Sequence, residues 1–266
     1  MSAPYAHGHQ PSVLKSHTWR TVANSAQYVV PYISTDSRIL DIGCGPGSLT
    51  NELGSLCRQG SVIGIDLSEN VIEIATATEH SENVSFEIID AFHMPFDDNS
   101  FDVVHAHQVL QHVPNPVALL AEMSRVVRPT GVVAVRDSEY SGFTWSPKSS
   151  ELEKWLTTYI AIAKFCGGEP DAGRHLKRWA TEASLEIVNQ SSSTWVFEST
   201  EDVKWWGETW ADRVLNSNFA DHAKSLNLLT DLDLQIMHDG WISWSQCNPA
   251  YFIIPHDELI ARKRLD

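Results

Sequence analysis

Residues 38–50 read R-I-L-D-I-G-C-G-P-G-S-L-T, and this stretch decides the fold of the chain. Its apolar run, residues 39–42, is typical of a buried strand, and residues 49–57 carry apolar side chains at helical spacing. Between the two lie three alternate glycines, Gly43, Gly45 and Gly47. A strand that turns through glycines into a helix is expected to bring unpaired backbone N–H groups and the positive helix end to one spot. Because glycine lets a ligand approach the backbone closely, the stretch predicts a ligand site.

The spacing of the glycines indicates which class of ligand such a turn can bind. A dinucleotide-binding fingerprint needs G-x-G-x-x-G, but Ser48 stands where the third glycine should be. A phosphate-binding P-loop needs a lysine after its glycines, and none follows here. The pattern is instead D-x-G-x-G-x-G, in which Asp41 suits a ligand with an amino group and would repel a pyrophosphate. At this point a purely structural turn is the alternative.

Composition narrows the class of protein. The chain has 266 residues, enough for one large domain or one domain with an appendage. It carries 19 Lys plus Arg against 34 Asp plus Glu, a net charge of −15, so no nucleic-acid partner is expected. The four cysteines are scattered without C-x-x-C pairs, which predicts free thiols in a reducing compartment. No signal peptide is evident, and no run approaches the about 18 apolar residues of a membrane span, so we expect a cytoplasmic protein.

Four further strands are expected after the glycine turn, at residues 61–65, 84–89, 102–106 and 132–136. Helical patterns that include residues 71–75 and 117–126 alternate with them, and R-P-T-G at 128–131 is expected to form a turn. This alternation predicts an α/β fold with a doubly wound, mostly parallel sheet and ligands at the carboxyl ends of the strands.

Two of these strands end in acids. Asp66, about twenty residues past the glycines, can accept both ribose hydroxyls of a nucleoside. Its alternative role is to cap the next helix, for which Ser68 is the better candidate. Asp90 can accept from an adenine amino group, with the Ala91 N–H facing a ring nitrogen and Phe92 packing nearby. An ordinary loop acid is the alternative reading of Asp90.

Six segments now stand in order: D-I-G-C-G-P-G, G-I-D-L-S, I-I-D-A, S-F-D-V-V, Q-H-V-P-N-P and R-V-V-R-P-T-G. Together they resemble class I S-adenosylmethionine-dependent methyltransferases of the ubiquinone/menaquinone-biosynthesis type, over roughly residues 36–137. The resemblance implies a Rossmann-like fold and S-adenosylmethionine as the cofactor, held by Asp41, Gly43, Asp66, Asp90 and the region of Gln108. The full set of expected cofactor-binding residues adds Arg20, Cys44, Gly45, Gly47, Leu67, Ala91, Phe92 and His107. The resemblance implies no particular acceptor, because such enzymes methylate quinones, sterols and many secondary metabolites.

The chain is expected to have three parts: an arm and helix covering the site (1–34), a cofactor-binding core (35–140), and a helical substrate lid plus strands completing the sheet (141–266). The first part has an amphipathic helix at about 19–30. The last part has helices at 151–165, 173–182, around 205–210 and at 226–244, and strands at 185–188, 195–198 and 251–254. The basic run 262–264 is expected at a solvated helix end. Nine of the ten tryptophans lie at Trp145 or later, and we expect two or three of them to line an acceptor pocket.

Methyl transfer from a sulfonium is an in-line displacement, so the protein mainly orients the reactants and excludes water, which can supply about 7–11 kcal/mol. A base is needed only where the acceptor loses a proton, and histidine is the natural candidate. The candidate catalytic residues are His107, where the strand opens onto the cofactor, His112 and Tyr140. His112 either lies near the cofactor sulfur or caps a helix, and Tyr140 lies near the expected acceptor. His105 is expected to be a satisfied core histidine.

Other polar residues carry open alternatives. His105, His107 and His112 have a suggestive spacing, but no acid interleaves them and no C-x-x-C accompanies them, so no metal site is expected. In the N-terminal arm, Tyr5, His7 and His9 either touch the substrate as a lid or form an exposed loop. Arg20 either pairs with the cofactor carboxylate or makes a surface salt bridge.

The sequence therefore predicts a methyltransferase that acts on a small, partly apolar metabolite with oxygen, carbon, nitrogen or sulfur as acceptor. A nucleobase nitrogen is disfavoured because the chain lacks an N-P-P-Y type of motif. The main alternative is a non-methylating protein of the same fold, a regulator or a rearrangement catalyst, that would bind the cofactor without producing S-adenosylhomocysteine. A nicotinamide-dependent oxidoreductase is disfavoured by Asp41 and Ser48. A homodimer is compatible with the sequence.

Overall fold

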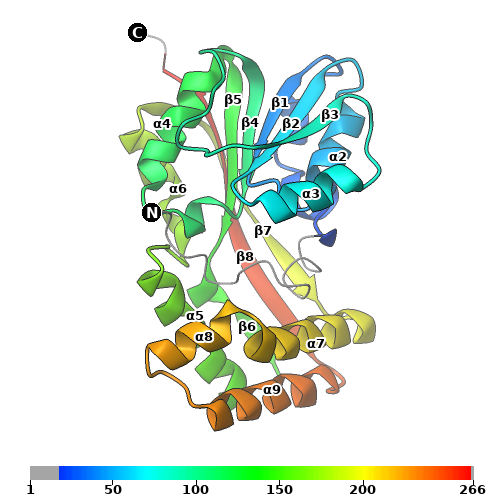
Figure 1. The fold of residues 1–266 in the computed structure, drawn as a ribbon, viewed down its shortest axis with the longest axis vertical. Coiled ribbons are helices and arrows are strands. Elements are labelled where there is room, and N and C mark those ends of the chain that lie inside the picture. The colour runs from blue at the N-terminus through cyan, green and yellow to red at the C-terminus, as the bar shows by residue number, and fades with distance from the viewer. Residues whose placement is uncertain (1–17, 265–266) are drawn as a thin grey trace.

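The computed structural model describes residues 18–264, in which eight strands form a single mixed sheet (Figure 1). The strands are β1 (Arg38–Ile42), β2 (Ser61–Asp66), β3 (Val84–Ile88), β4 (Phe101–His107), β5 (Val127–Ser138), β6 (Thr144–Ser146), β7 (Leu185–Phe197) and β8 (Tyr251–Lys263). The order β3-β2-β1-β4-β5 is parallel throughout, and β8 then pairs antiparallel with β5, β6 and β7. The predicted doubly wound, mostly parallel α/β fold is confirmed.

Helices cover both faces of the parallel strands because alternate side chains point to opposite faces. One core joins α4 (Pro116–Val126) and α6 (Leu176–Glu182) to residues such as Leu40 and Val104. The opposite core joins α2 (Ser48–Leu56) to residues such as Ile39 and Val103. The short helix α3 (Glu69–Ala77) packs on β2 and β3. The sheet is therefore buried on both sides, and its carboxyl edge is the place left for a site.

A second group of helices forms a separate aromatic core beside this edge (Figure 1). It consists of α5 (Ser150–Phe165), α7 (Thr200–Asn216), α8 (Asn218–Ser225) and α9 (Asp231–Ser245). At its centre the ring of Trp155 lies 4.4 Å from Trp210 and 4.9 Å from Trp241, with Phe252 of β8 against them. The long strands β7 and β8 run from the parallel sheet into this group, so one set of backbone pairings joins the two cores.

The segment before β1 is less helical than expected. It makes one turn of π-helix, η1 (Val22–Ala26), and a short 3-10 turn, η2 (Val30–Tyr32), instead of a helix over 19–30. Thr21 caps the first turn by accepting from the Asn24 N–H at 3.2 Å. The apolar residues still face the sheet, since Val22 and Ala26 are buried beside α2. The arm itself, residues 1–17, lies outside the described residues.

Four other expectations about elements are wrong. Residues 128–131 belong to β5 rather than a turn, because Gly131 lets the Asp102 carbonyl come close: a Cβ there would lie 2.5 Å from that oxygen. The strands expected at 185–188 and 195–198 are one strand, whose polar middle pairs with β8. The helix expected at 226–244 begins only at Asp231, because Thr230 and Asp233 form a capping box that starts α9 there, and residues 226–230 connect it to α8. The basic run 262–264 lies at the end of β8, which stops at Lys263, and not at the end of a helix.

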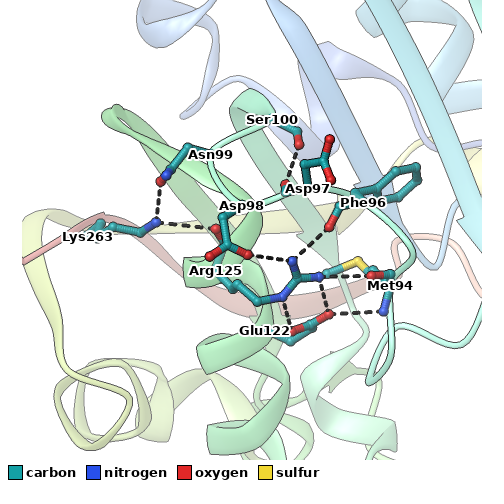
Figure 2. Close-up of polar contacts among 9 residues, drawn as sticks. All are labelled: Met94, Phe96, Asp97, Asp98, Asn99, Ser100, Glu122, Arg125 and Lys263. Atoms are coloured by element: carbon teal, nitrogen blue, oxygen red, sulfur yellow. Dashed lines mark hydrogen bonds and ion pairs between the residues drawn. The ribbon is translucent and has the colours of Figure 1, made fainter.

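The loop between β3 and β4 is fastened by one arginine of α4, as Figure 2 shows. The Arg125 guanidinium donates to the carbonyl oxygens of Met94 at 2.8 Å and Phe96 at 2.7 Å, and to the carboxylates of Asp98 and Glu122 at 2.8 Å. These bonds fix the loop that begins at the end of β3, where three expected cofactor residues, Asp90, Ala91 and Phe92, lie.

Candidate functional site

The glycine turn has the backbone that its sequence predicts, with positive φ values of 65° at Gly43, 56° at Gly45 and 84° at Gly47. The expectation of unpaired N–H groups is wrong for this turn, because its N–H groups bond within the protein. Those of Gly43 and Cys44 donate to the Ile65 carbonyl at 2.8 and 3.0 Å, and that of Gly47 donates to the Cys44 carbonyl at 3.2 Å. The turn is therefore tied to β2 rather than left open.

Packing, as well as ligand approach, explains two of the glycines. A Cβ at Gly47 would lie 2.6 Å from the Phe86 ring, and a Cβ at Gly43 would lie 2.5 Å from a Val109 methyl group. Both distances are too short for any side chain, and positive φ adds strain for any residue other than glycine. The glycines therefore let the turn sit tightly against its neighbours.

Asp41 is buried beneath the turn. Its two carboxylate oxygens accept from the Thr50 hydroxyl at 2.6 Å and from His105 Nδ1 at 2.8 Å. These bonds join β1, β4 and the start of α2. His105 is thus held on one side as expected of a core histidine, but its Nε2 has no partner among the described residues.

Asp66 organises the end of β2. Its carboxylate accepts from the Gly45 N–H at 3.3 Å and the Ser68 N–H at 3.0 Å, so it holds the turn and the start of α3 together. Ser68 occupies the cap position of α3 without a side-chain hydrogen bond. Neighbouring Leu67 is exposed. The carboxylate is half-buried, and its role toward a ribose stays a prediction.

Asp90 lies on the loop beside Asp66, since the Ile89 N–H donates to the Asp66 carbonyl at 3.1 Å. Its carboxylate accepts from the Phe92 N–H at 2.9 Å and contacts His93 Nδ1 at 3.3 Å. Ala91 and Phe92 pack partly buried against the adjacent core. The structure therefore brings the ends of β2 and β3 together, as an adenosine site requires, while these adenine contacts stay predictions.

A small cavity of about 10 Å³ lies at the centre of these elements. It is lined by Arg20, Asp41, Gly43, Cys44, Gly45, Ser48, Leu49 and His107, of which six are expected cofactor residues. The remaining expected residues lie on the glycine turn, at or just after the end of β2, on the loop after β3 and just after β4. A cavity of this size has room for about one water molecule, so side chains must move apart before a nucleoside can occupy it.

Gln108 links three parts of the chain around this cavity. It has a positive φ of 54°, rare for a residue other than glycine, and its side-chain oxygen accepts from Arg20 Nη2 at 2.6 Å. Its amide nitrogen lies 2.8 Å from His256 Nε2, while His256 Nδ1 lies 3.1 Å from the Ile254 carbonyl. Since a carbonyl only accepts, Nδ1 carries the proton, and Nε2 accepts from Gln108. One amide thus joins the N-terminal segment to β8.

His107 differs from the other predicted catalytic residues in its hydrogen bonding and in its place at the cavity. It is 4 % exposed, lines the cavity, and neither ring nitrogen has a partner among the described residues. Burial lowers the pKa of His107 well below its usual value, and the positive charges of Arg20 and Arg136 lower it further. The ring is therefore neutral at neutral pH and offers one donor and one acceptor.

His112 and Tyr140 are placed differently. His112 ends the short turn η3 (Leu110–His112), and burial with the charge of Arg20 lowers its pKa to about 3. Its Nε2 lies 3.1 Å from the Gln111 amide nitrogen. Tyr140 begins η4 (Tyr140–Gly142) and stacks on Phe143 and Tyr159, both at 4.4 Å. Burial raises the pKa of Tyr140, so its hydroxyl is protonated at neutral pH, and its catalytic role stays a prediction.

Aromatic side chains form a wall beside His107. Its ring lies edge-on to Trp195 of β7 at 5.6 Å, and Trp195 also meets Trp19 at 5.1 Å and His256 at 4.5 Å. Trp19 in turn contacts Phe197. The Trp195 indole donates to the Asn24 carbonyl at 2.7 Å, which fastens η1 over this wall.

Several polar residues near the site were not found from the sequence: Tyr28, Thr50, Arg136, His256 and Glu258. Only Arg136 had a signal in the sequence: it is a charged residue at the end of the apolar strand predicted at 132–136. Within residues 18–264, no group of three or more His, Cys, Asp or Glu side chains could hold a metal ion, and no helix could span a membrane.

This fold and this glycine site define a class I S-adenosylmethionine-dependent methyltransferase. A sequence profile described as "Methyltransferase domain" matches residues 33–200, and the chain belongs to this family. An uncharacterized methyltransferase of Schizosaccharomyces pombe is 32% identical over 273 residues, covering 97% of this chain and 96% of that protein. A demethylmenaquinone methyltransferase of Staphylococcus haemolyticus is 36% identical over 104 residues, only 38% of this chain and 44% of that protein.

Solved structures share the fold at low identity. A methyltransferase-like protein of Bacillus halodurans matches with a TM-score of 0.58 at 18% identity, covering 90% of this chain and 98% of that one. A phosphoethanolamine N-methyltransferase of Haemonchus contortus, with S-adenosylhomocysteine bound, matches with a TM-score of 0.59 at 17% identity, covering 97% of this chain and 58% of that one. These structures show the shared fold, and the family match shows that the chain is an S-adenosylmethionine-dependent enzyme.

The residues present fit this cofactor. The carboxylate of Asp66 stands at the end of β2, the positive-φ glycines Gly43 and Gly45 line the cavity, and Arg20 lines it with them. The set supplies acceptors for hydroxyl groups and a cation for a carboxylate, which is the donor and acceptor pattern of S-adenosylmethionine. By contrast, the Cys44 thiol stays uncharged and offers the cofactor no charge, because burial raises its pKa well above the usual value.

Proposed function

We propose that this enzyme methylates a small, partly apolar metabolite that binds against His107 and the adjoining aromatic wall of Trp19, Trp195 and Phe197. The observation that carries the proposal is the position of that wall. It stands directly beside the one predicted catalytic histidine that lines the cofactor cavity. Rigid aromatic walls with few polar groups suit a small ligand rather than a nucleic acid or protein chain.

In this proposal the cofactor lies along the carboxyl ends of β2, β1 and β4. Asp66 accepts from the ribose hydroxyls, the loop at Asp90 meets the adenine, and Arg20 binds the carboxylate of the cofactor. Arg20 must then leave Gln108, from which it is now 2.6 Å away, or share the two partners. When bound, S-adenosylmethionine supplies a methyl group on a sulfonium sulfur, open to in-line displacement.

The chain's own contribution is orientation and exclusion of water. Trp195 is buried and held by Asn24, so the acceptor would meet a fixed surface. His107 is neutral and orients the acceptor by a hydrogen bond, and because protonating it is unfavourable it is a weak base. Tyr140 and His112 would act as neutral hydrogen-bonding groups at the border of the pocket. The resemblance to quinone methyltransferases covers a minor part of the chain, so no quinone acceptor is assumed.

The test is transfer of label from S-adenosyl-[methyl-³H]methionine by the full chain. A cell extract is divided into a filtered small-molecule fraction and a macromolecular fraction, and each is incubated with the enzyme. We expect label in organic-extractable small molecules, with Asp66→Ala giving only background. Label confined to protein or nucleic acid would overturn the proposal.

A further inference from the structure

A row of buried polar residues crosses the sheet on the face covered by residues 21–28. It follows the strand register, in which Asp41 pairs with His105, His107 with Arg136, Arg136 with Glu258, and Glu258 with Ser191. Side chains at paired positions lie on the same face of a sheet. The row therefore begins beneath the glycine turn and passes His107 before it reaches β8.

The far end of the row is satisfied by its own neighbours. Glu258 accepts from the hydroxyls of Ser191, at 2.7 Å, and Ser193. It also accepts from Arg136 Nε at 3.3 Å, and Nε lies 3.1 Å from the Ser193 hydroxyl. One edge of the Arg136 guanidinium is thus fixed, and its plane cannot rotate freely.

The other edge of the guanidinium is not used. Arg136 is fully buried, yet its Nη1 and Nη2 atoms have no hydrogen-bond partner among the described residues. The buried hydroxyl of Tyr28 and both ring nitrogens of His107 share this condition. Buried charged donors are almost always paired, so such a group of orphans indicates a ligand.

Arg136 carries the positive charge at this place, and the Glu258 carboxylate meets it on one edge only. Burial lowers the pKa of Arg136 to about 10, which leaves it protonated at neutral pH. Burial and the nearby guanidinium groups keep the pKa of His256 well below its usual value, so His256, like His107, is neutral. The Arg136 guanidinium lies 5.2 Å from the Trp195 ring centroid, beside the proposed acceptor wall.

We propose that Arg136 is the anchor of the acceptor pocket and that the acceptor carries a carboxylate, which Nη1 and Nη2 bind side by side. This inference rests on the proposed function and names its substrate class. A fork of two parallel N–H donors matches the two oxygens of a carboxylate, and Glu258 bonds only to the Nε edge of the guanidinium. His107, one strand nearer to the cofactor cavity, and the Tyr28 hydroxyl would contact the same ligand.

The test uses pairs of probes that differ in charge but hardly in shape: formate and formamide, benzoate and benzamide, 1-naphthoate and 1-naphthamide. Each is titrated calorimetrically into the full chain saturated with S-adenosylhomocysteine. At least one carboxylate is expected to bind about tenfold or more tightly than its amide. Equal affinities within every pair, including no binding of either member, would overturn the inference.

Variants separate anion binding from a structural role. Arg136→Met combined with Glu258→Gln removes the buried pair together, so no charge is left alone, and it should abolish the carboxylate preference. Glu258→Gln by itself should keep or strengthen that preference, because it removes a competing carboxylate. Arg178→Met, on the exposed face of α6, is the matched control and should match the parent chain.

The two proposals fail in different ways. If S-adenosylhomocysteine binds and small molecules are labelled while no carboxylate preference exists, only the present inference falls. If label enters macromolecules alone, the proposed function falls. A preference that persists in the Arg136→Met/Glu258→Gln double variant would place the anion elsewhere and overturn the assignment.

Discussion

Replacing Arg125 by alanine should release the loop between β3 and β4 and destabilise the whole chain. The guanidinium is about one-third exposed and donates to two main-chain carbonyls and two carboxylates. Bonds from a charged donor to the two carbonyls are worth about 1.5 kcal/mol each at the lower end of their range. The partly exposed ion pairs add about 0.5 kcal/mol each. We therefore expect a loss of about 3–4 kcal/mol.

The matched control is Arg128→Ala, because Arg128 is similarly exposed but makes one ion pair, to Asp102 at 2.6 Å. That variant should lose at most about 1 kcal/mol. In thermal unfolding, Arg125→Ala should melt about 6–15 °C lower than the parent, and Arg128→Ala within about 4 °C. Equal melting temperatures for the two variants would refute the reasoning that the loop contacts carry the effect.

The same arginine makes a pH-dependent contribution. Hydrogen bonds from Arg125 lower the pKa of Glu122 below its ordinary value of 4.5. A carboxyl group with a depressed folded-state pKa stabilises the protein above its unfolded-state pKa, and this stabilisation is lost as the pH falls through the folded-state value. The difference in stability between the parent and Arg125→Ala should therefore narrow below about pH 4.5. A difference that is constant down to pH 3 would mean that Glu122 contributes nothing.

Four further outcomes are expected. Asp66→Ala should weaken S-adenosylhomocysteine binding by about 100-fold or more, since two charged hydrogen bonds to the ribose are lost; unchanged affinity in calorimetry would contradict the ribose role. His107→Ala should lower turnover by about tenfold or more at nearly constant cofactor affinity, whereas a loss of affinity alone would make it a cofactor-binding residue. Gly47→Ala, whose Cβ would meet Phe86, should cost about 2–4 kcal/mol in urea unfolding. Burial raises the pKa of Asp137 from 3.8 to about 8, so the parent chain should lose stability relative to Asp137→Asn as the pH rises from about 4 to 8, and parallel pH profiles would contradict this.

The parallel core could be predicted from the sequence because its signals are local. Each strand is an apolar run of a few residues, and acids such as Asp66 follow at fixed distances from the glycines. The polar middle of β7 could not be predicted, because residues 189–194 read N-Q-S-S-S-T and resemble a loop. Their strand character comes from the pairing with β8, where Ser191 and Ser193 meet Glu258. The polar side chains of this strand find their hydrogen-bond partner on β8, far away in the sequence, so no local pattern could reveal it.

The candidate site likewise has a part that the sequence predicts and a part that it does not. Six of the expected cofactor residues line one cavity because they belong to one motif or to the ends of neighbouring strands. Arg136 and Tyr28 escaped prediction because their meeting depends on strand register and on how the N-terminal segment folds back over the sheet. The roles of Gly43 and Gly47 were incompletely predicted, since the space that a Cβ would need is taken by Val109 and Phe86.

The charges of the site link the two proposals. The chain carries a net charge of −15, yet the groups around His107 include two guanidiniums, those of Arg20 and Arg136, beside neutral imidazoles. The carboxylates of Asp41 and Glu258 are bonded to neighbours of their own. The cofactor adds a cationic sulfonium to this place, and like charges in a water-poor site repel strongly. Its own carboxylate can offset Arg20, but Glu258 only partly offsets Arg136, because it binds a single edge of that guanidinium. An acceptor that brings a negative charge completes the balance, and it would bind more tightly once the cofactor is in place than before it.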